Sequence, residues 1–269
     1  MNQLSPRTSR IGLLLVAVLF LSATLPYLGD YPMLDWAQMG IAAPAHKLAT
    51  EGIYGNDLFT GFYASELRNY EYMPAYPLLV AFSFKILGLG VWQARVVSVL
   101  AGLGVVLLTY RLGRQLYGRS VGLAAAVLLT TLRLGTSAST SGIPLLDFSR
   151  IIRYDILVPV FVLAASSVFI TTLANHTTNQ ERSPGRVRMR TWGLLATGFL
   201  AGLATLSHLY GAFILLTFVT VLVWQERWSV IKQPSTYSLP LGWLLALAPW
   251  LYYVAQDVGA YRGQMSRHE

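Results

Sequence analysis

A chain of 269 residues with 54% hydrophobic and only 12% charged residues lies far outside the composition of soluble domains, which predicts an integral membrane protein. The net charge is +8, but the basic residues stand in short patches between apolar runs, which argues against a nucleic acid as partner and favours a role in membrane orientation. The chain contains no Cys, which excludes disulfides, thiolate metal ligands and a cysteine nucleophile.

The first apolar run, 11–28, follows Arg7 and Arg10 and is long enough to cross about 30 Å of hydrocarbon. A cleaved signal peptide is the alternative, but the many later apolar runs favour an uncleaved first helix. Further runs predict spans, and several of them need flanking residues to reach spanning length: 92–110, 121–134, 156–174, 192–206, 209–224 and 239–254.

The run 75–90 is short, contains Lys85 and is expected to lie at the interface without crossing, where Lys85 can reach water. If it does not cross, three basic patches lie on the inner side, as the positive-inside rule requires; if it does cross, all three lie outside. The patches are Arg111, Arg114 and Arg119; Arg182, Arg186, Arg188 and Arg190; and Arg227 with Lys232. The sequence therefore predicts an all-α membrane domain, 1–269, with about seven transmembrane helices, a cytoplasmic N-terminus and an outer C-terminus.

In this topology two long polar segments, 29–91 and 135–155, share the outer face with the short turn at Ser207 and His208. Within the first, 32–49 predicts an amphipathic interfacial helix, and 52–72 predicts an irregular loop. This clustering of polar residues at one membrane face is where we expect chemistry.

Each acidic candidate in these segments also has a structural explanation. Asp35 and Gln38 have the spacing of an N-terminal capping box, and Asp155 opens a predicted span, where the helix dipole stabilises a carboxylate. Glu71 is either a solvated loop residue or a ligand. A capping role for Asp35 is compatible with a catalytic one.

The candidate cations have two interpretations as well. Arg150 and Arg153 lie on the outer face against the positive-inside trend, which favours an anionic partner, although both side chains could instead reach lipid phosphates. His208 lies at a predicted helix end, where a structural histidine is usual.

A series of short motifs follows along the chain: Asp35 after the first span, Tyr70-Glu71-Tyr72-Met73-Pro74 before Pro77-Leu78-Leu79, Gln93-Ala94-Arg95, Leu112-Gly113-Arg114-Gln115-Leu116-Tyr117-Gly118, Ser149-Arg150, Arg153-Tyr154-Asp155 and Ala204-Thr205-Leu206-Ser207-His208. Their order resembles the polyprenyl-phosphate-dependent membrane glycosyltransferases of the GT-C fold. This family includes protein O-mannosyltransferase-like enzymes and the lipid A aminoarabinose transferase.

The resemblance implies transfer of a sugar from a polyprenyl-phosphate donor to a lipid, glycan or protein acceptor at the outer face of a bacterial-type plasma membrane. It assigns the catalytic carboxylate of the first outer loop to Asp35 and a second acidic position to Asp155. Arg153, His208 or a divalent metal cation would stabilise the departing phosphate. Glu71 and Asp155 would then bind the metal or the donor sugar.

The chain departs from the family pattern at several positions. Trp36 stands where a second acidic residue is frequent, Tyr72 where the family often has Lys in Glu-Lys-Pro-Pro, and His208 where many members have Lys. The chain is also shorter than family members, which predicts an N-terminal membrane module without the usual C-terminal part. A multi-span transporter, or an inactive or partial fragment that needs a partner, is the alternative.

Overall fold

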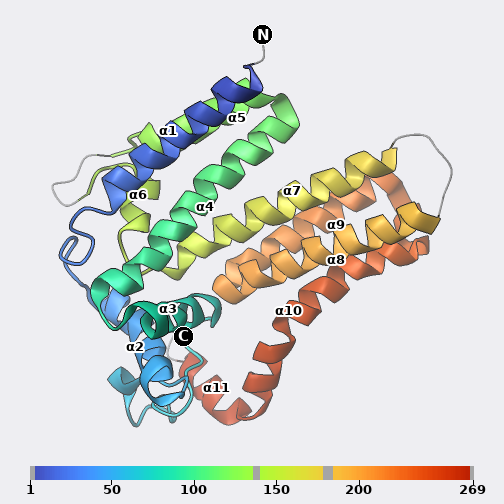
Figure 1. The fold of residues 1–269 in the computed structure, drawn as a ribbon. Helices are drawn as coiled ribbons and strands as arrows, with labels where there is room; N and C mark the ends of the chain where they lie inside the picture. The colour runs from blue at the N-terminus through green and yellow to red at the C-terminus, as the bar shows by residue number, and fades with distance from the viewer. Residues whose placement is uncertain (1–3, 136–139, 178–183, 267–269) are drawn as a thin grey trace. The chain divides into compact units, whose positions relative to one another are not determined.

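The computed structural model describes residues 4–135, 140–177 and 184–266, so that 136–139 of the predicted second outer loop and Arg182 lie outside the described residues. The chain divides into two compact units, 1–157 with 253–269 and 158–252 (Figure 1). The expectation of a single membrane domain over 1–269 stays a prediction.

The helices of the first unit are α1 Pro6–Thr24, α2 Trp36–Glu51, η1 Asp57–Phe59, α3 Ala75–Leu87, α4 Val91–Tyr117, α5 Arg119–Thr131, α6 Pro144–Ser149, η2 Tyr154–Ile156 and α11 Val258–Met265. Those of the second unit are α7 Leu157–Thr177, α8 Pro184–Ser207, η3 Leu209–Ala212, α9 Phe213–Glu226, η4 Arg227–Lys232, η5 Pro234–Tyr237 and α10 Ser238–Ala255.

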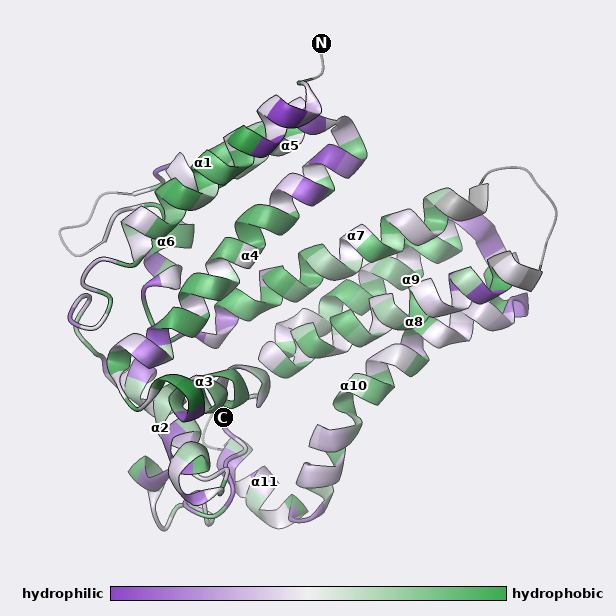
Figure 2. Ribbon diagram, in the orientation of Figure 1, coloured by the Kyte–Doolittle hydropathy of each residue, from purple (hydrophilic) through white to green (hydrophobic). Residues whose placement is uncertain are grey.

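The predicted all-helical membrane fold is confirmed, with fewer spanning helices than expected (Figure 2). Among the described residues, five helical segments are long and apolar enough to cross a membrane: Pro6–Thr24, Val91–Tyr117, Tyr154–Ala174, Leu209–Lys232 and Pro234–Ala255. The run 121–134 lies in α5, which has 13 residues and is only about 20 Å long. The run 192–206 lies in α8, whose first turns carry Arg188 and Arg190.

Local chemistry explains the bounds of α1. Ser5 caps its first turn by accepting the Thr8 N–H at 3.1 Å, and Pro6 occupies the first helical position. The helix ends at Thr24, four residues before the predicted end. Leu25 still has helical φ and ψ, and its N–H donates to the Leu21 carbonyl, but Pro26 has no N–H with which to continue the helical hydrogen bonds.

The predicted interfacial helix is α2, which begins at Trp36. Asp35 Oδ1 accepts the Gln38 N–H at 2.8 Å, which confirms Asp35 as the cap. The reciprocal half of the capping box was predicted wrongly, because the Gln38 side chain turns inward, donates to the Met33 carbonyl and is 1% exposed. Gly52 ends the helix with a positive φ of 76°.

The helices of the first unit approach closely at glycines. A Cβ on Gly113 of α4 would lie 2.9 Å from Gly122 Cα of α5, and a Cβ on Gly102 would lie 2.1 Å from Ser149 Oγ of α6. Small residues let helix backbones pack closely in membranes, where apolar burial gives little drive for association. These contacts bring α4 against α5, which precedes the second polar segment, and against α6, which lies within it.

The irregular segment after α2 is fastened by α11. Gln264 is 2% exposed; its Nε2 donates to the carbonyls of Tyr63 and Arg68 at 3.1 and 2.8 Å, and its Oε1 accepts the Tyr70 N–H at 2.8 Å. The Tyr253 hydroxyl donates to the Tyr54 carbonyl at 3.0 Å. Residues near 260 therefore hold the loop that leads to Glu71.

The second unit has its own apolar core, formed by Ala165, Phe169, Leu194, Ala201, Phe218, Leu222, Val230 and Leu239. Gly198 and Gly202 of α8 face α10, since a Cβ on Gly198 would lie 1.9 Å from the Leu239 carbonyl oxygen. At the other end of α8, buried Arg190 donates to Glu226 at 2.7 Å and to Gln233, which ties the end of α9 and the segment after it to α8.

Replacement of Asp35 should separate its capping role from its charge. Asp35→Ala should lower the free energy of unfolding by about 1 kcal/mol, because the Gln38 N–H loses its acceptor, whereas Asn caps nearly as well and should preserve stability. Thermal unfolding of the two variants beside the wild type in one detergent measures the difference. If Ala and Asn destabilised the protein equally, the stabilising role of Asp35 would not be that of a helix cap.

Replacement of Gln264 by Ala should destabilise the first unit by about 1–3 kcal/mol, because two carbonyls and one N–H lose their partner in a buried site. Limited proteolysis should then cut 52–74 faster than in the wild type. Gln256→Ala is the matched control, since Gln256 is exposed. Unchanged cleavage and unfolding in Gln264→Ala would show that α11 does not hold this loop.

Candidate active site

The guanidinium of Arg95 is the centre of a buried hydrogen-bond cluster in the first unit. Arg95 is 0% exposed; its Nε and Nη2 donate to Gln38 Oε1 at 3.3 and 3.0 Å, its Nη1 to the Leu28 carbonyl at 3.0 Å, and its Nη2 to the Pro32 carbonyl at 2.6 Å. Gln38 Oε1 also accepts the Ile152 N–H at 3.2 Å. The cluster joins α4, the first turns of α2 and both polar segments.

Arg150 makes a second set of contacts with the chain that precedes α2. Its Nη1 donates to the Ala23 carbonyl at 3.0 Å, and its Nη2 donates to the carbonyls of Pro26 at 2.8 Å and Tyr31 at 3.3 Å. The Arg150 Cζ atom lies over the Tyr31 ring, 5.8 Å from the ring centroid. Both arginines therefore bind main-chain carbonyls between the end of α1 and Asp35.

A pocket of about 600 Å³ opens beside Asp35. Its polar wall includes Asp35, Gln38, Asp147 and Arg150. Asp147 accepts the N–H groups of Ser141 and Gly142 at 2.8 and 3.1 Å, which shapes the loop before α6. We call this the polar pocket.

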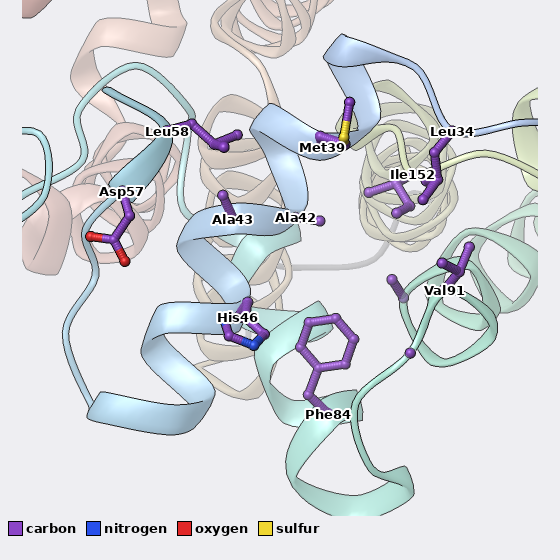
Figure 3. A pocket seen from close by; sticks show the side chains of 12 residues that line it. Leu34, Met39, Ala42, Ala43, His46, Asp57, Leu58, Phe84, Val91 and Ile152 are labelled. Carbon is purple, nitrogen blue, oxygen red and sulfur yellow. The ribbon is translucent and has the colours of Figure 1, made fainter. Parts of the chain in front are cut away.

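A second pocket of about 460 Å³ is almost entirely apolar (Figure 3). It is lined by residues from α2, α3 and the start of α4, among them Met39, Ala42, Phe84 and Ala94, with His46 and Asp57 at its edge. We call this the apolar pocket.

The two pockets share a wall. Met33 and Asp35 line the polar pocket, whereas Leu34 between them lines the apolar one. In the same way, Ile151 lines the polar pocket and Ile152 lines the apolar one, because successive side chains of an extended segment point to opposite sides. Because Gln38 binds the Ile152 N–H, the buried cluster lies in this wall.

Three further predicted residues gather around Tyr154. Arg153 forms an ion pair with Asp155, with Nη2 and Oδ2 at 3.1 Å, and both side chains are half-buried. Glu71 interacts electrostatically with Tyr154, and the neighbouring Tyr72 ring lies 6.1 Å from the Tyr154 ring. The structure thus brings Glu71 of the first polar segment near Arg153 and Asp155, which follow directly after the pocket wall at 151–152.

His208 belongs to the second unit. Its Nδ1 accepts the Tyr210 N–H at 3.3 Å, and its ring lies 4.1 Å from the Tyr210 ring, so it caps η3. This local geometry agrees with the structural role expected of a histidine at a helix end.

Over the described part of the chain, no group of three or more His, Cys, Asp or Glu side chains has the geometry to hold a metal ion. The assignment of Glu71 and Asp155 as ligands of a divalent cation stays a prediction.

Charged residues of α2 and of the loop that follows it form contacts that stabilise this loop. The hydrogen bond to Asp57 raises the pKa of Lys47, and Glu51 lies 3.6 Å from the Lys47 ammonium. The Gly61 N–H, which Glu66 Oε2 accepts at 2.9 Å, lowers the pKa of Glu66. These pairs shape the chain between Asp35 and Glu71.

Sequence reasoning did not assign Gln38, Arg95 or Asp147 to the site. One feature of the sequence could have identified Arg95: it lies a few residues inside a predicted span, where an arginine needs buried hydrogen-bond acceptors. Asp147 carried none, because its partners are backbone N–H groups of an irregular loop.

Comparison with known proteins places this geometry in a family. The family model described as dolichyl-phosphate-mannose-protein mannosyltransferase matches residues 72–253, whereas no curated protein matches the chain. The crystal structure of ArnT from Cupriavidus metallidurans bound to undecaprenyl phosphate is similar, with a TM-score of 0.66, 16% identity, and coverage of 96% of this chain and 43% of that chain. Apo ArnT from the same organism has a TM-score of 0.63, 18% identity, and coverage of 98% and 45%.

The chain spans less than half the length of both ArnT structures, and identity at this level shows a shared fold. The family model, in contrast, covers more than half of the chain and includes Arg95, Arg153, Asp155 and His208. The resemblance inferred from the order of the motifs is thereby confirmed. The chain belongs to the dolichyl-phosphate-mannose-protein mannosyltransferase family and is an integral membrane protein.

Proposed function

We propose that this chain carries the catalytic membrane module of a glycosyltransferase, which moves a sugar from a polyprenyl-phosphate donor to an acceptor hydroxyl or amine. Family membership supports the reaction class, and the ArnT structure with bound undecaprenyl phosphate supports the lipid class. The acceptor is a lipid, a glycan or a protein.

The position of Asp35 carries this proposal. Its carboxylate is exposed at the wall of the polar pocket, and Oδ1 is held by the Gln38 N–H. Within the described residues, no hydrogen bond to Oδ2 is found. One oxygen therefore orients the group while the other can accept a proton.

In the proposed reaction the acceptor oxygen or nitrogen attacks the anomeric carbon and forms the new glycosidic bond. The bond from that carbon to the lipid phosphate oxygen breaks, and the lipid phosphate leaves with the electron pair. Asp35 Oδ2 takes the proton of the acceptor, a general-base contribution of about 100- to 10,000-fold.

The leaving phosphate needs positive charge, which we assign to Arg153. A phosphate contact by His208, which belongs to the second unit, stays a prediction. Asp155 holds the Arg153 guanidinium in place, and we assign donor-sugar contacts to Asp155 and Glu71. The apolar pocket on the other side of the wall suits the first part of the lipid chain. A divalent cation, if bound, would be held by Glu71 and Asp155 and would supply positive charge to the leaving phosphate.

We further propose a bacterial-type plasma membrane with the N-terminus in the cytoplasm and the polar pocket at the outer face. The distribution of arginines supports this orientation, since Arg111, Arg114 and Arg119 lie at the α4–α5 turn, at the ends of these helices remote from the polar pocket.

Asp35→Asn should lower sugar transfer at least about 100-fold while donor binding persists, because the amide caps α2 but accepts no proton. The assay is donor consumption by purified protein in lipid, offered polyprenyl-phosphate sugars and outer-surface acceptors. Asp30→Asn is the matched control, an exposed carboxylate of the same loop. Full activity in Asp35→Asn would remove Asp35 as the base, and inactive wild type would contradict the proposed reaction for this chain.

Single cysteines should report the orientation, because the chain has no native Cys. A membrane-impermeant maleimide added to intact cells should label Tyr63→Cys, whereas Gln115→Cys and Trp228→Cys should react only after permeabilisation. Labelling of Gln115→Cys in intact cells would reverse the proposed orientation.

A further inference from the structure

We propose that Arg150 and Arg95 are positioning residues that clamp the segment before α2 by its main-chain carbonyls and thereby orient Asp35. The catalytic part of this inference rests on the proposed role of Asp35 as the base.

The need for a clamp follows from the end of α1. The last carbonyls of a helix have no partner within the helix, and buried backbone groups left unpaired destabilise a structure. Between Ala23 and Pro32 the chain turns from α1 toward α2 through two prolines, and prolines donate no backbone N–H. The carbonyls of Leu25 and Tyr27 accept N–H groups of the same segment, whereas other carbonyls need donors from elsewhere in the chain.

The two arginines supply these donors from two sides. Arg150 binds the carbonyls of Ala23, Pro26 and Tyr31, and Arg95 binds those of Leu28 and Pro32. A guanidinium suits this task because it presents five N–H donors in a fixed plane, whereas the Lys ammonium has three donors at one point. A cation near the end of α1 is also favoured by the helix dipole.

The occupied donors change the interpretation of Arg150. As a cation at the outer face, it was expected to bind an anion or to reach lipid phosphates. Both of its Nη atoms instead bind carbonyls, and its Nε is buried without a hydrogen-bond partner. Arg150 lines the polar pocket as a structural brace, whereas Arg153 pairs with the half-buried Asp155 side chain.

The clamp acts close to the base. Tyr31 and Pro32 lie only four and three residues before Asp35, and Arg95 interacts electrostatically with both Asp35 and Arg150. Arg95 also binds Gln38, whose N–H donates to Asp35 Oδ1. Loosening either arginine should therefore free the start of α2 and the carboxylate together.

A spin label at residue 33 tests the clamp without any assay of activity. Met33 is 84% exposed, and Met33→Cys provides the only thiol in the full chain. In lipid, the nitroxide spectrum should show restricted motion in the parent and a larger fast component with Arg150→Met or Arg150→Lys. Arg153→Met is the matched control and should leave the spectrum unchanged.

Unchanged label motion in both folded Arg150 variants would overturn the clamp, and so would an equal change in Arg153→Met. Arg95 is fully buried, so Arg95→Lys serves as the second variant, with thermal unfolding as the check on folding. If both Arg150 variants unfold while Arg153→Met stays folded, Arg150 supports stability alone and the positioning role fails.

Kinetics test the catalytic consequence. Arg150→Lys should lower kcat about 10- to 100-fold with little change in the KM for the donor, because a misplaced base slows the reaction and leaves phosphate contacts intact. A main effect on donor KM would make Arg150 a phosphate ligand and overturn the inference. Inactive wild type contradicts the proposed function instead, while the spin-label result still decides whether the clamp exists.

Discussion

The first unit depends on a fully buried guanidinium, to which no carboxylate of the described residues is bound. Removing such a charge from water costs several kcal/mol unless its hydrogen bonds are replaced. Arg95 replaces them with one side-chain amide and two main-chain carbonyls, which all come from residues 28–38. The need to satisfy one charge therefore fixes the segment after α1, the start of α2 and α4 relative to one another.

The wall built around this cluster separates two chemical environments. Asp35 faces a polar pocket, and Leu34, its neighbour in the chain, faces an apolar one. A lipid-linked sugar has the same division, with a polar head and an isoprenoid chain. Side chains of the extended segments 33–35 and 151–152 point alternately to the two pockets. One layer of backbone can therefore contact both the sugar phosphate and the isoprenoid chain of the proposed donor.

The second unit also packs at glycines, but its buried arginine is part of an ion pair. Gly198 and Gly202 allow α8 to pack backbone to backbone against α10, which suits helices in lipid. Arg190 and Glu226 pair in a buried position at the basic end of α8, where an ion pair is less costly than an isolated charge. His208, at the opposite end of α8, caps η3.

Local pattern and composition determined the membrane class, the irregular loop 52–72, the Asp35 cap and, through the order of its motifs, the family. These properties depend on residues close in sequence or on the average character of the chain. The tertiary structure decided that Gln38 binds Arg95 and Ile152 and does not complete the capping box, and that Arg150 binds carbonyls more than a hundred residues away. It also reduced the predicted seven spans to five in the described residues. The reason is physical: which donors and carbonyls remain unpaired, and which partners can reach them, depends on how the helices pack, and no short stretch of sequence contains that information.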